Sequence, residues 1–216
     1  MSTGELAGAG VRNNGPPATI GSVEEDHRCS HLNCNTSGAS FHGHLDIQTL
    51  GGAGFASQRT ANDDCHRHWE LASFAGLEVA IDLSQSDNHM YTLILKDTVL
   101  PRNPVDGREQ STVSWEAEFS KADCRVEHST RSHTRTASLF IPWDRFKPTY
   151  RGKPCGASQP LDLSNIKRIA IMIRSFFGSQ EGDFCLGIIS IAGCSSPGLE
   201  PPTPCETCTN DQHAGA

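Results

Sequence analysis

The sequence lacks any long run of apolar residues. None of its 216 residues belong to a stretch approaching the roughly 20 apolar positions that a transmembrane helix needs. The first twenty residues contain no apolar segment typical of a secretory signal. With Arg12 as their single cation and an acid at Glu5, they also make a poor mitochondrial presequence. We therefore expect an intracellular protein with no membrane span.

Positive charge is also scarce. The chain has 18 Lys and Arg residues against 25 Asp and Glu residues, which gives a formal net charge of −7. A protein that binds nucleic acid through its phosphates needs a surplus of cations. The composition therefore argues against a general nucleic-acid binder.

An ordered cysteine framework is missing as well. The nine cysteines are odd in number and scattered in spacing, so we expect mostly free, reduced thiols. Cys205 and Cys208 have the C-x-x-C spacing of zinc knuckles and redox loops, but they lie in a proline-rich tail without a second ligand pair. We expect no cofactor.

Helical periodicity is absent too, since no segment sustains it over twelve residues and only 57–74 favours a short helical turn. Short segments typical of β-strands are present instead, separated by turn-forming residues. The segments 166–174 and 183–193 are apolar on both faces, as expected for central strands. The predicted strands cover residues 41–50, 54–59, 76–83, 89–96, 112–119, 137–143, 166–174 and 183–193.

This pattern predicts an all-β fold, an antiparallel β-sandwich or jelly roll. The polar segments at each end have no apolar pattern to bury. We therefore predict a disordered segment over 1–25, a β-sandwich domain over 26–194 and a disordered tail over 195–216.

The segment 112–119 alternates cleanly between apolar and polar residues. Trp115 and Phe119 are predicted to point to one face, and Ser114, Glu116 and Glu118 to the other. Glu116 and Glu118 could act as acid and base from one strand face, although exposed acidic residues on a sheet are far more common. They are weak catalytic candidates.

Two histidine pairs have the i, i+2 spacing that places both rings on one face of a strand. They are His42 with His44, and His66 with His68. Such pairs suit a transition metal, but the sequence nominates no third ligand. Solvent-facing histidines are the simpler interpretation, so these four residues are weak metal candidates.

The segment 141–154 contains three prolines, which exclude a helix and a continuous strand. Trp143 is predicted to pack inward, and Pro142 is acceptable only at a sheet edge. Arg151 is predicted to pair with an acidic residue of a neighbouring loop through its planar guanidinium.

Four segments in this order carry a resemblance: FHG at 41–43, GGAGFASQR at 51–59, IPWDRFKPTYRG at 141–152 and FCLGIISI at 184–191. Together they resemble the complex I intermediate-associated protein family (the thirty-kilodalton type). The resemblance implies a galactose-binding-like β-jelly roll. It also implies, from the best-known members, a mitochondrial chaperone role in assembling respiratory complex I. The segment 24–40 departs from the family pattern because it lacks the usual G-G-x-S.

Three functions follow as alternatives. The first is a non-catalytic assembly factor or interaction module whose protein partners include complex I assembly intermediates, with the loops at 98–111 and 120–136 supplying contacts. By resemblance it would be mitochondrial, and a cytosolic location is the alternative.

The second alternative is a module that binds a glycan or another small polar molecule. Sugar sites combine aromatic platforms with planar hydrogen-bonding groups, and Arg59, Tyr91, Trp115 and Arg151 supply these types. The third is a tailoring enzyme of specialised metabolism that uses the two glutamates or the histidines.

Overall fold

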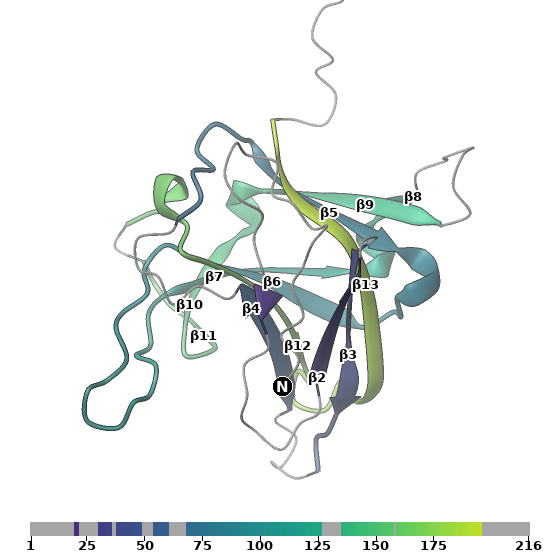
Figure 1. Ribbon diagram of the computed structural model, residues 1–216, viewed down its shortest axis with the longest axis horizontal. Coiled ribbons are helices and arrows are strands. Elements are labelled where there is room, and N and C mark those ends of the chain that lie inside the picture. The colour runs from purple at the N-terminus through teal and green to yellow at the C-terminus, as the bar shows by residue number, and fades with distance from the viewer. Residues whose placement is uncertain are drawn as a thin grey trace, which may run out of the picture.

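Two antiparallel sheets pack face to face and enclose the core, as Figure 1 shows. The computed structural model describes residues 20–21, 30–35, 38–48, 54–60, 68–126, 135–157 and 159–195. One sheet has seven strands and the other six within these ranges. The predicted β-sandwich of the jelly-roll type is confirmed.

The seven-stranded sheet runs in the order β1 (Ile20–Gly21), β4 (Phe55–Thr60), β12 (Arg168–Arg174), β6 (Met90–Lys96), β7 (Ser114–Ser120), β10 (Lys147–Tyr150) and β11 (Lys153–Pro154). The six-stranded sheet runs in the order β2 (Ser30–Asn35), β3 (Gly38–Leu45), β13 (Gly182–Cys194), β5 (Gly76–Asp82), β9 (Thr136–Pro142) and β8 (Arg125–Val126). Four 3₁₀ helices lie in the connections: η1 (Leu83–Gln85), η2 (Lys121–Asp123), η3 (Trp143–Arg145) and η4 (Leu163–Asn165).

The core lies between the two sheets and is built from the apolar face of each strand. The rings of Phe41, Tyr91, Phe119 and Phe184 meet there, with centroid distances of 5.0 to 6.3 Å between contacting rings. Each large buried side chain contributes about 1.5–3 kcal/mol to folding. The two strands predicted to be central, β12 and β13, each lie between two neighbours.

The helical turn predicted within 57–74 is not seen in the part of that range that the structure describes. Phe55–Thr60 is a strand, and Trp69 forms a β-bridge with Ile166. The helical turns are η1 to η4 instead, and at η1 and η4 the side chains of Asp82 and Asp162 accept hydrogen bonds from the backbone two residues on. Such local capping has no hydrophobic period, so helical periodicity does not reveal it.

Five short strands were not predicted: β1, β2, β8, β10 and β11. β1, β8 and β11 have only two residues each, β10 contains a proline and β2 is mostly polar, so none of them gives a strong strand signal. Ile20–Gly21 pair with β4 and thereby depart from the predicted disorder of 1–25. No helix among the described residues is long and apolar enough to span a membrane.

The segment 141–154 behaves largely as predicted. Pro142 ends β9 beyond the two residues that pair with β8, so it sits at a free edge of the sheet. Trp143 packs against the core, and its indole N–H donates to the Phe74 carbonyl at 2.6 Å. Phe146 is buried next to it.

A candidate binding groove on the outer face of the seven-stranded sheet

A groove of about 850 Å³ lies on the face of the seven-stranded sheet that points away from the core. Alternating residues of four neighbouring strands form its floor. The register places Ile94 of β6 beside Glu116 of β7, and Glu116 beside Lys147 of β10. Met172 of β12 completes the apolar part of this floor.

Glu116 and Glu118 share this outer face with Ser114, as the alternation of 112–119 predicted. Both carboxylates bind one guanidinium. Arg174 Nη1 lies 3.0 Å from Glu116 Oε2, and Arg174 Nη2 donates to Glu118 Oε1 at 2.7 Å. Thr149 also donates to Glu116 Oε1 at 2.6 Å. The two glutamates therefore hold Arg174 over the groove, and their catalytic use stays a prediction.

Three further cations line the side of the groove formed by β10 and its flanking turns. Arg145 donates to the Glu118 carbonyl at 2.9 Å, and Lys147 to the Asp144 carbonyl at 2.7 Å. Arg151 Nε donates to the Ser111 hydroxyl at 3.2 Å. Within the described ranges, none of these three cations pairs with a carboxylate.

The prediction for Arg151 is therefore wrong in its chemistry. Its partner does come from a neighbouring loop, but that partner is the Ser111 hydroxyl and not an acid. The guanidinium also lies over the Tyr150 ring, 5.5 Å from its centroid. Arg151 has a φ of 51° in the tight turn that Gly152 completes at 72°, and both residues line the groove.

Phenylalanines line the opposite side. Phe55 of β4 is 52% exposed and Phe177, in the turn between β12 and β13, is 96% exposed. Phe176 and Phe177 have φ values of 45° and 58°, a left-handed conformation that costs about 1–2 kcal/mol per bulky residue. Sequence reasoning missed this turn, although two aromatic residues directly before a glycine are a visible signal.

Gln180 holds the strained turn in place. Its amide nitrogen donates to the carbonyls of Arg174 at 2.7 Å and Met90 at 2.9 Å, and its amide oxygen accepts the Met90 N–H at 3.0 Å. Arg174 in turn lies over the Phe176 ring at 5.0 Å. Gln180 thereby fixes the backbone at both ends of the turn that carries Phe176 and Phe177.

Polar atoms without hydrogen bonds gather at the groove. In the described part of the chain, five buried side-chain polar atoms have no hydrogen-bond partner, and three are Thr92 Oγ1, Glu116 Oε2 and Arg174 Nε. Glu116 Oε2 is close to Arg174 Nη1 but outside hydrogen-bond geometry. Thr92 is the cross-strand neighbour of Glu118. Because folded proteins leave few such atoms, this clustering needs an explanation.

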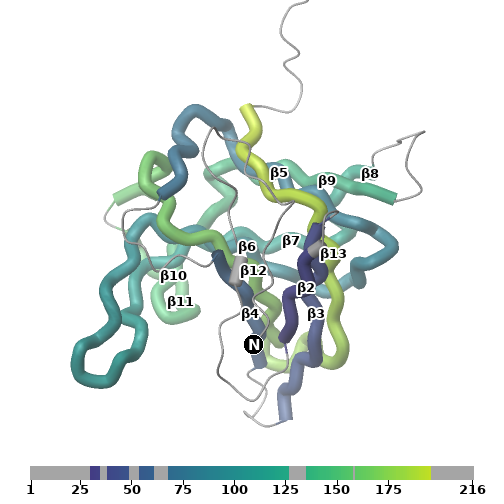
Figure 2. Tube along the Cα trace, in the orientation of Figure 1, coloured from purple at the N-terminus to yellow at the C-terminus, as the bar shows by residue number. Residues whose placement is uncertain are grey.

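The long connection between β6 and β7 lies beside the groove, where its Ser111 accepts the hydrogen bond from Arg151. Figure 2 shows this connection beside the β10–β11 hairpin. Glu109 anchors it by binding Arg59 and Arg168, the latter at 3.1 Å. Burial acts to raise the pKa of Glu109, but the hydrogen bond from Arg59 and the charge of Arg168 outweigh it and hold that pKa below its usual value. Arg59, a predicted ligand-binding residue, is thus engaged within the chain.

Tyr91 and Trp115, also predicted to bind a ligand, lie on the inner face of the sheet. Tyr91 is 0% exposed and Trp115 is 9% exposed. Burial is the main cause that raises the pKa of Tyr91, and the charge of Asp87 adds to it. These two rings belong to the core and do not line the groove, so of the four predicted residues only Arg151 does.

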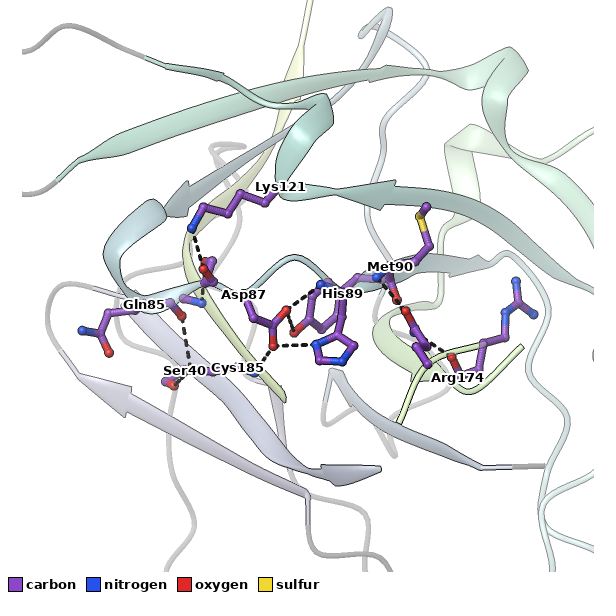
Figure 3. A network of polar contacts seen from close by, with 12 residues as sticks. Ser40, Gln85, Asp87, His89, Met90, Lys121, Arg174 and Cys185 are labelled. Carbon is purple, nitrogen blue, oxygen red and sulfur yellow. Dashed lines mark hydrogen bonds and ion pairs between the residues drawn. The ribbon is translucent and has the colours of Figure 1, made fainter. Parts of the chain in front are cut away.

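The hydroxyl of Tyr91 belongs to a separate polar cluster around Asp87, which Figure 3 shows. Asp87 Oδ1 accepts the Tyr91 hydroxyl at 3.0 Å and the His89 N–H at 2.8 Å. Its Oδ2 accepts the Cys185 N–H at 2.6 Å. Lys121 donates to two carbonyls of the same connection, at 2.7 and 2.8 Å. The cluster ties the β5–β6 connection to β13 and η2.

The predicted metal residues are placed apart from the groove. His42 lies on β3 with its ring 5.5 Å from that of His31, its neighbour on β2, and His44 Nδ1 is 2.7 Å from Asp183. His68 is exposed, and His66 lies outside the described residues. Among the described residues, no group of three or more His, Cys, Asp or Glu side chains could hold a metal ion.

The described cysteines at 34, 124, 155, 185 and 194 are free thiols. Burial, with the neighbouring charge of Asp123, raises the pKa of Cys124 to about 11, which makes that thiol a poor nucleophile. The C-x-x-C pair at 205 and 208 lies outside the described residues.

Comparison with known proteins places this geometry in context. Residues 28–188 match the family model described as Complex I intermediate-associated protein 30 (CIA30). An uncharacterized protein of Schizosaccharomyces pombe is 42% identical over 155 residues, which cover 72% of this chain and 64% of that protein. The match thus spans less than two thirds of this relative's length.

Solved structures show likeness of fold. A family 11 carbohydrate-binding module of a cellulosomal cellulase from Clostridium thermocellum has a TM-score of 0.46 at 15% identity, covering 90% of this chain and 97% of the module. An agarase has a TM-score of 0.41 at 13% identity, covering 92% of this chain and 25% of the agarase.

Proposed function

Because the chain belongs to the Complex I intermediate-associated protein 30 family, we propose that it is a non-catalytic binding module in the assembly of respiratory complex I. It would contact assembly intermediates through the groove on the seven-stranded sheet. The family match covers most of the β-sandwich, including every strand that lines the groove.

The observation that carries this proposal is the way the groove's charged residues are used. Both carboxylates, Glu116 and Glu118, are paired with Arg174, so the acids position a cation and are not left free as an acid–base pair. The remaining cations are held by neutral backbone and side-chain groups, and exposed phenylalanines line the opposite side of the groove. Exposed aromatic residues beside arginines are typical of protein interfaces.

The proposed place of action is the mitochondrion. This follows from the family's association with complex I intermediates. Tagged full-length chain should fractionate with mitochondria and resist added protease there. A chain found wholly in the cytosol would contradict the assembly role.

The test is co-migration of the tagged chain with complex I subcomplexes on native gels. We expect the triple variant Arg145→Glu, Lys147→Glu, Arg151→Glu to lose most of this co-migration, because it reverses the charge of one side of the groove. The matched control is Arg125→Glu, an exposed cation on β8 of the other sheet, which should migrate as the unaltered chain does. Co-migration that survives the triple variant would remove the groove as the contact.

A second candidate function, binding of a glycan or another small polar molecule, is favoured by the size of the groove. About 850 Å³ falls within the roughly 300–1,000 Å³ of small-molecule sites. Oligosaccharides at millimolar concentration should then raise the melting temperature of the chain, and less so for Phe177→Ala. An unchanged melting temperature across a broad oligosaccharide library would count against this candidate.

A further inference from the structure

We propose that the groove binds an extended, acidic peptide segment of a partner protein. Carboxylates of this segment would meet Arg145, Lys147 and Arg151, and an apolar side chain would pack against Phe55 and Phe177. The inference rests on the proposed function, since it names the chemistry of the partner that an interaction module would recognise.

Charge is the first argument for an acidic ligand. The chain carries a net charge of −7, yet four cations and only two carboxylates line the groove. Both carboxylates are used by Arg174, which leaves Arg145, Lys147 and Arg151 with neutral partners only. Three cations gathered on an acidic protein favour a negatively charged partner and repel a basic one.

The distance between the two sides of the groove sets the length of the ligand. The cationic side belongs to β10 and the phenylalanine side begins at β4, and the sheet order β4-β12-β6-β7-β10 separates them by four inter-strand spacings. At about 4.8 Å each, these amount to roughly 19 Å. An extended chain covers that distance in about six residues at about 3.3 Å per residue. A single small anion is too short to reach both sides.

The floor of the groove is already paired within the chain. Arg174 Nη1 lies 3.0 Å from Glu116 Oε2, and the Glu116 side chain is only 8% exposed. The partner segment therefore meets the three cations and the phenylalanines at the sides of the groove, and not the carboxylates of its floor.

The sheet edge makes the alternative peptide mode, strand addition, unfavourable. Pro148 lies in β10 and Pro154 in β11, the last two strands on this side of the sheet. Proline offers no N–H for pairing, so these strands are blunted against an added strand. The partner segment therefore lies across the face of the sheet.

The experiment is phage display of random decapeptides on the immobilised full-length chain, with subtraction on the folded Arg145→Glu, Lys147→Glu, Arg151→Glu variant. The expected pool is rich in Asp and Glu, with one aromatic or aliphatic residue about four to six positions away from the acids. A pool without acidic enrichment, or one that the subtraction does not change, would overturn the proposal.

A synthetic peptide with the selected consensus then tests each side of the groove by fluorescence anisotropy. We expect about tenfold weaker binding for the triple variant, a several-fold loss for Phe177→Ala, and weaker binding at 300 mM than at 50 mM salt. Arg125→Glu should bind as the unaltered chain does, and circular dichroism checks that each variant folds.

Two other results would overturn the inference. One is selection of neutral peptides only, and the other is an oligosaccharide that stabilises the chain while no peptide is selected. Acidic-peptide binding without co-migration with complex I subcomplexes would leave this inference standing and reject the proposed function. Co-migration without groove-dependent peptide binding would reject this inference and leave the proposed function standing.

Discussion

Asp87 and Glu116 are both carboxylates held by hydrogen bonds within the sandwich, but their surroundings differ. Asp87 accepts hydrogen bonds from two backbone N–H groups and from the buried Tyr91 hydroxyl. Glu116 accepts one hydrogen bond from Thr149 and has one oxygen without any, and Arg174 beside it has a nitrogen without any.

The difference separates a cluster that stabilises the fold from one that is suited to binding. Around Asp87 both carboxylate oxygens accept hydrogen bonds, one from His89 and Tyr91 and the other from Cys185, although the His89 ring nitrogen Nδ1, 2.9 Å from Oδ2, makes no hydrogen bond. Around Glu116 the polar groups are only partly used, and an open groove lies next to them. Partly satisfied buried groups are costly for folding, so their presence at a groove points to function.

The largest effect should come from the Asp87 cluster. We expect Asp87→Ala to lower the free energy of unfolding by about 3 kcal/mol, because it removes a charged acceptor and leaves the Tyr91 hydroxyl buried without a partner. Urea denaturation measures the change. The control Asp183→Ala removes only an exposed contact with His44 and should be nearly neutral. Equal effects of the two substitutions would contradict the structural role of Asp87.

A smaller loss of folding stability is expected from substitutions at the groove. Arg174→Leu should cost about 2 kcal/mol, below the range for a fully buried ion pair because Arg174 is partly exposed. Adding Glu116→Gln should recover part of that loss, since it removes the unpaired charge left behind. Arg145→Leu, which loses only a bond to a carbonyl, serves as the control. A double variant no more stable than Arg174→Leu alone would speak against coupling of Glu116 and Arg174.

The smallest effect concerns Glu109, which anchors the β6–β7 connection. Its pKa is depressed in the folded chain, so its stabilising contribution is complete above the ordinary glutamate pKa of about 4.3 and is lost as the pH falls through the depressed value. Glu109→Gln should therefore lower stability by less than about 1 kcal/mol at pH 7, and this difference should shrink below about pH 4.

Urea midpoints of the unaltered chain and of Glu109→Gln, measured between pH 2.5 and 7, test this prediction. The exposed Glu181→Gln serves as a control and should show no such pH-dependent difference. If the effect of Glu109→Gln were the same at every pH, the ion pairs with Arg59 and Arg168 would not carry the contribution.

The sequence predicted some residues of the candidate site correctly and others wrongly. Alternation placed Glu116 and Glu118 on the outer face, because a strand's period of two depends on local sequence alone. The same rule placed Trp115 on the inner face, which conflicts with using it as a sugar platform. Tyr91 was proposed as a ligand residue from its chemical type, and burial decided otherwise.

The sequence by itself determined the all-β class, the alternation of 112–119, the two central strands and the family resemblance, since all of these follow from local patterns of residue types. Only the tertiary structure decided that Arg174 joins Glu116 and Glu118, that Arg145, Lys147 and Arg151 face Phe55 and Phe177, and that Glu109 engages Arg59. The physical reason is that these contacts depend on strand order and register. Segments more than fifty residues apart become neighbours through long-range pairing, and no local period encodes which strands pair.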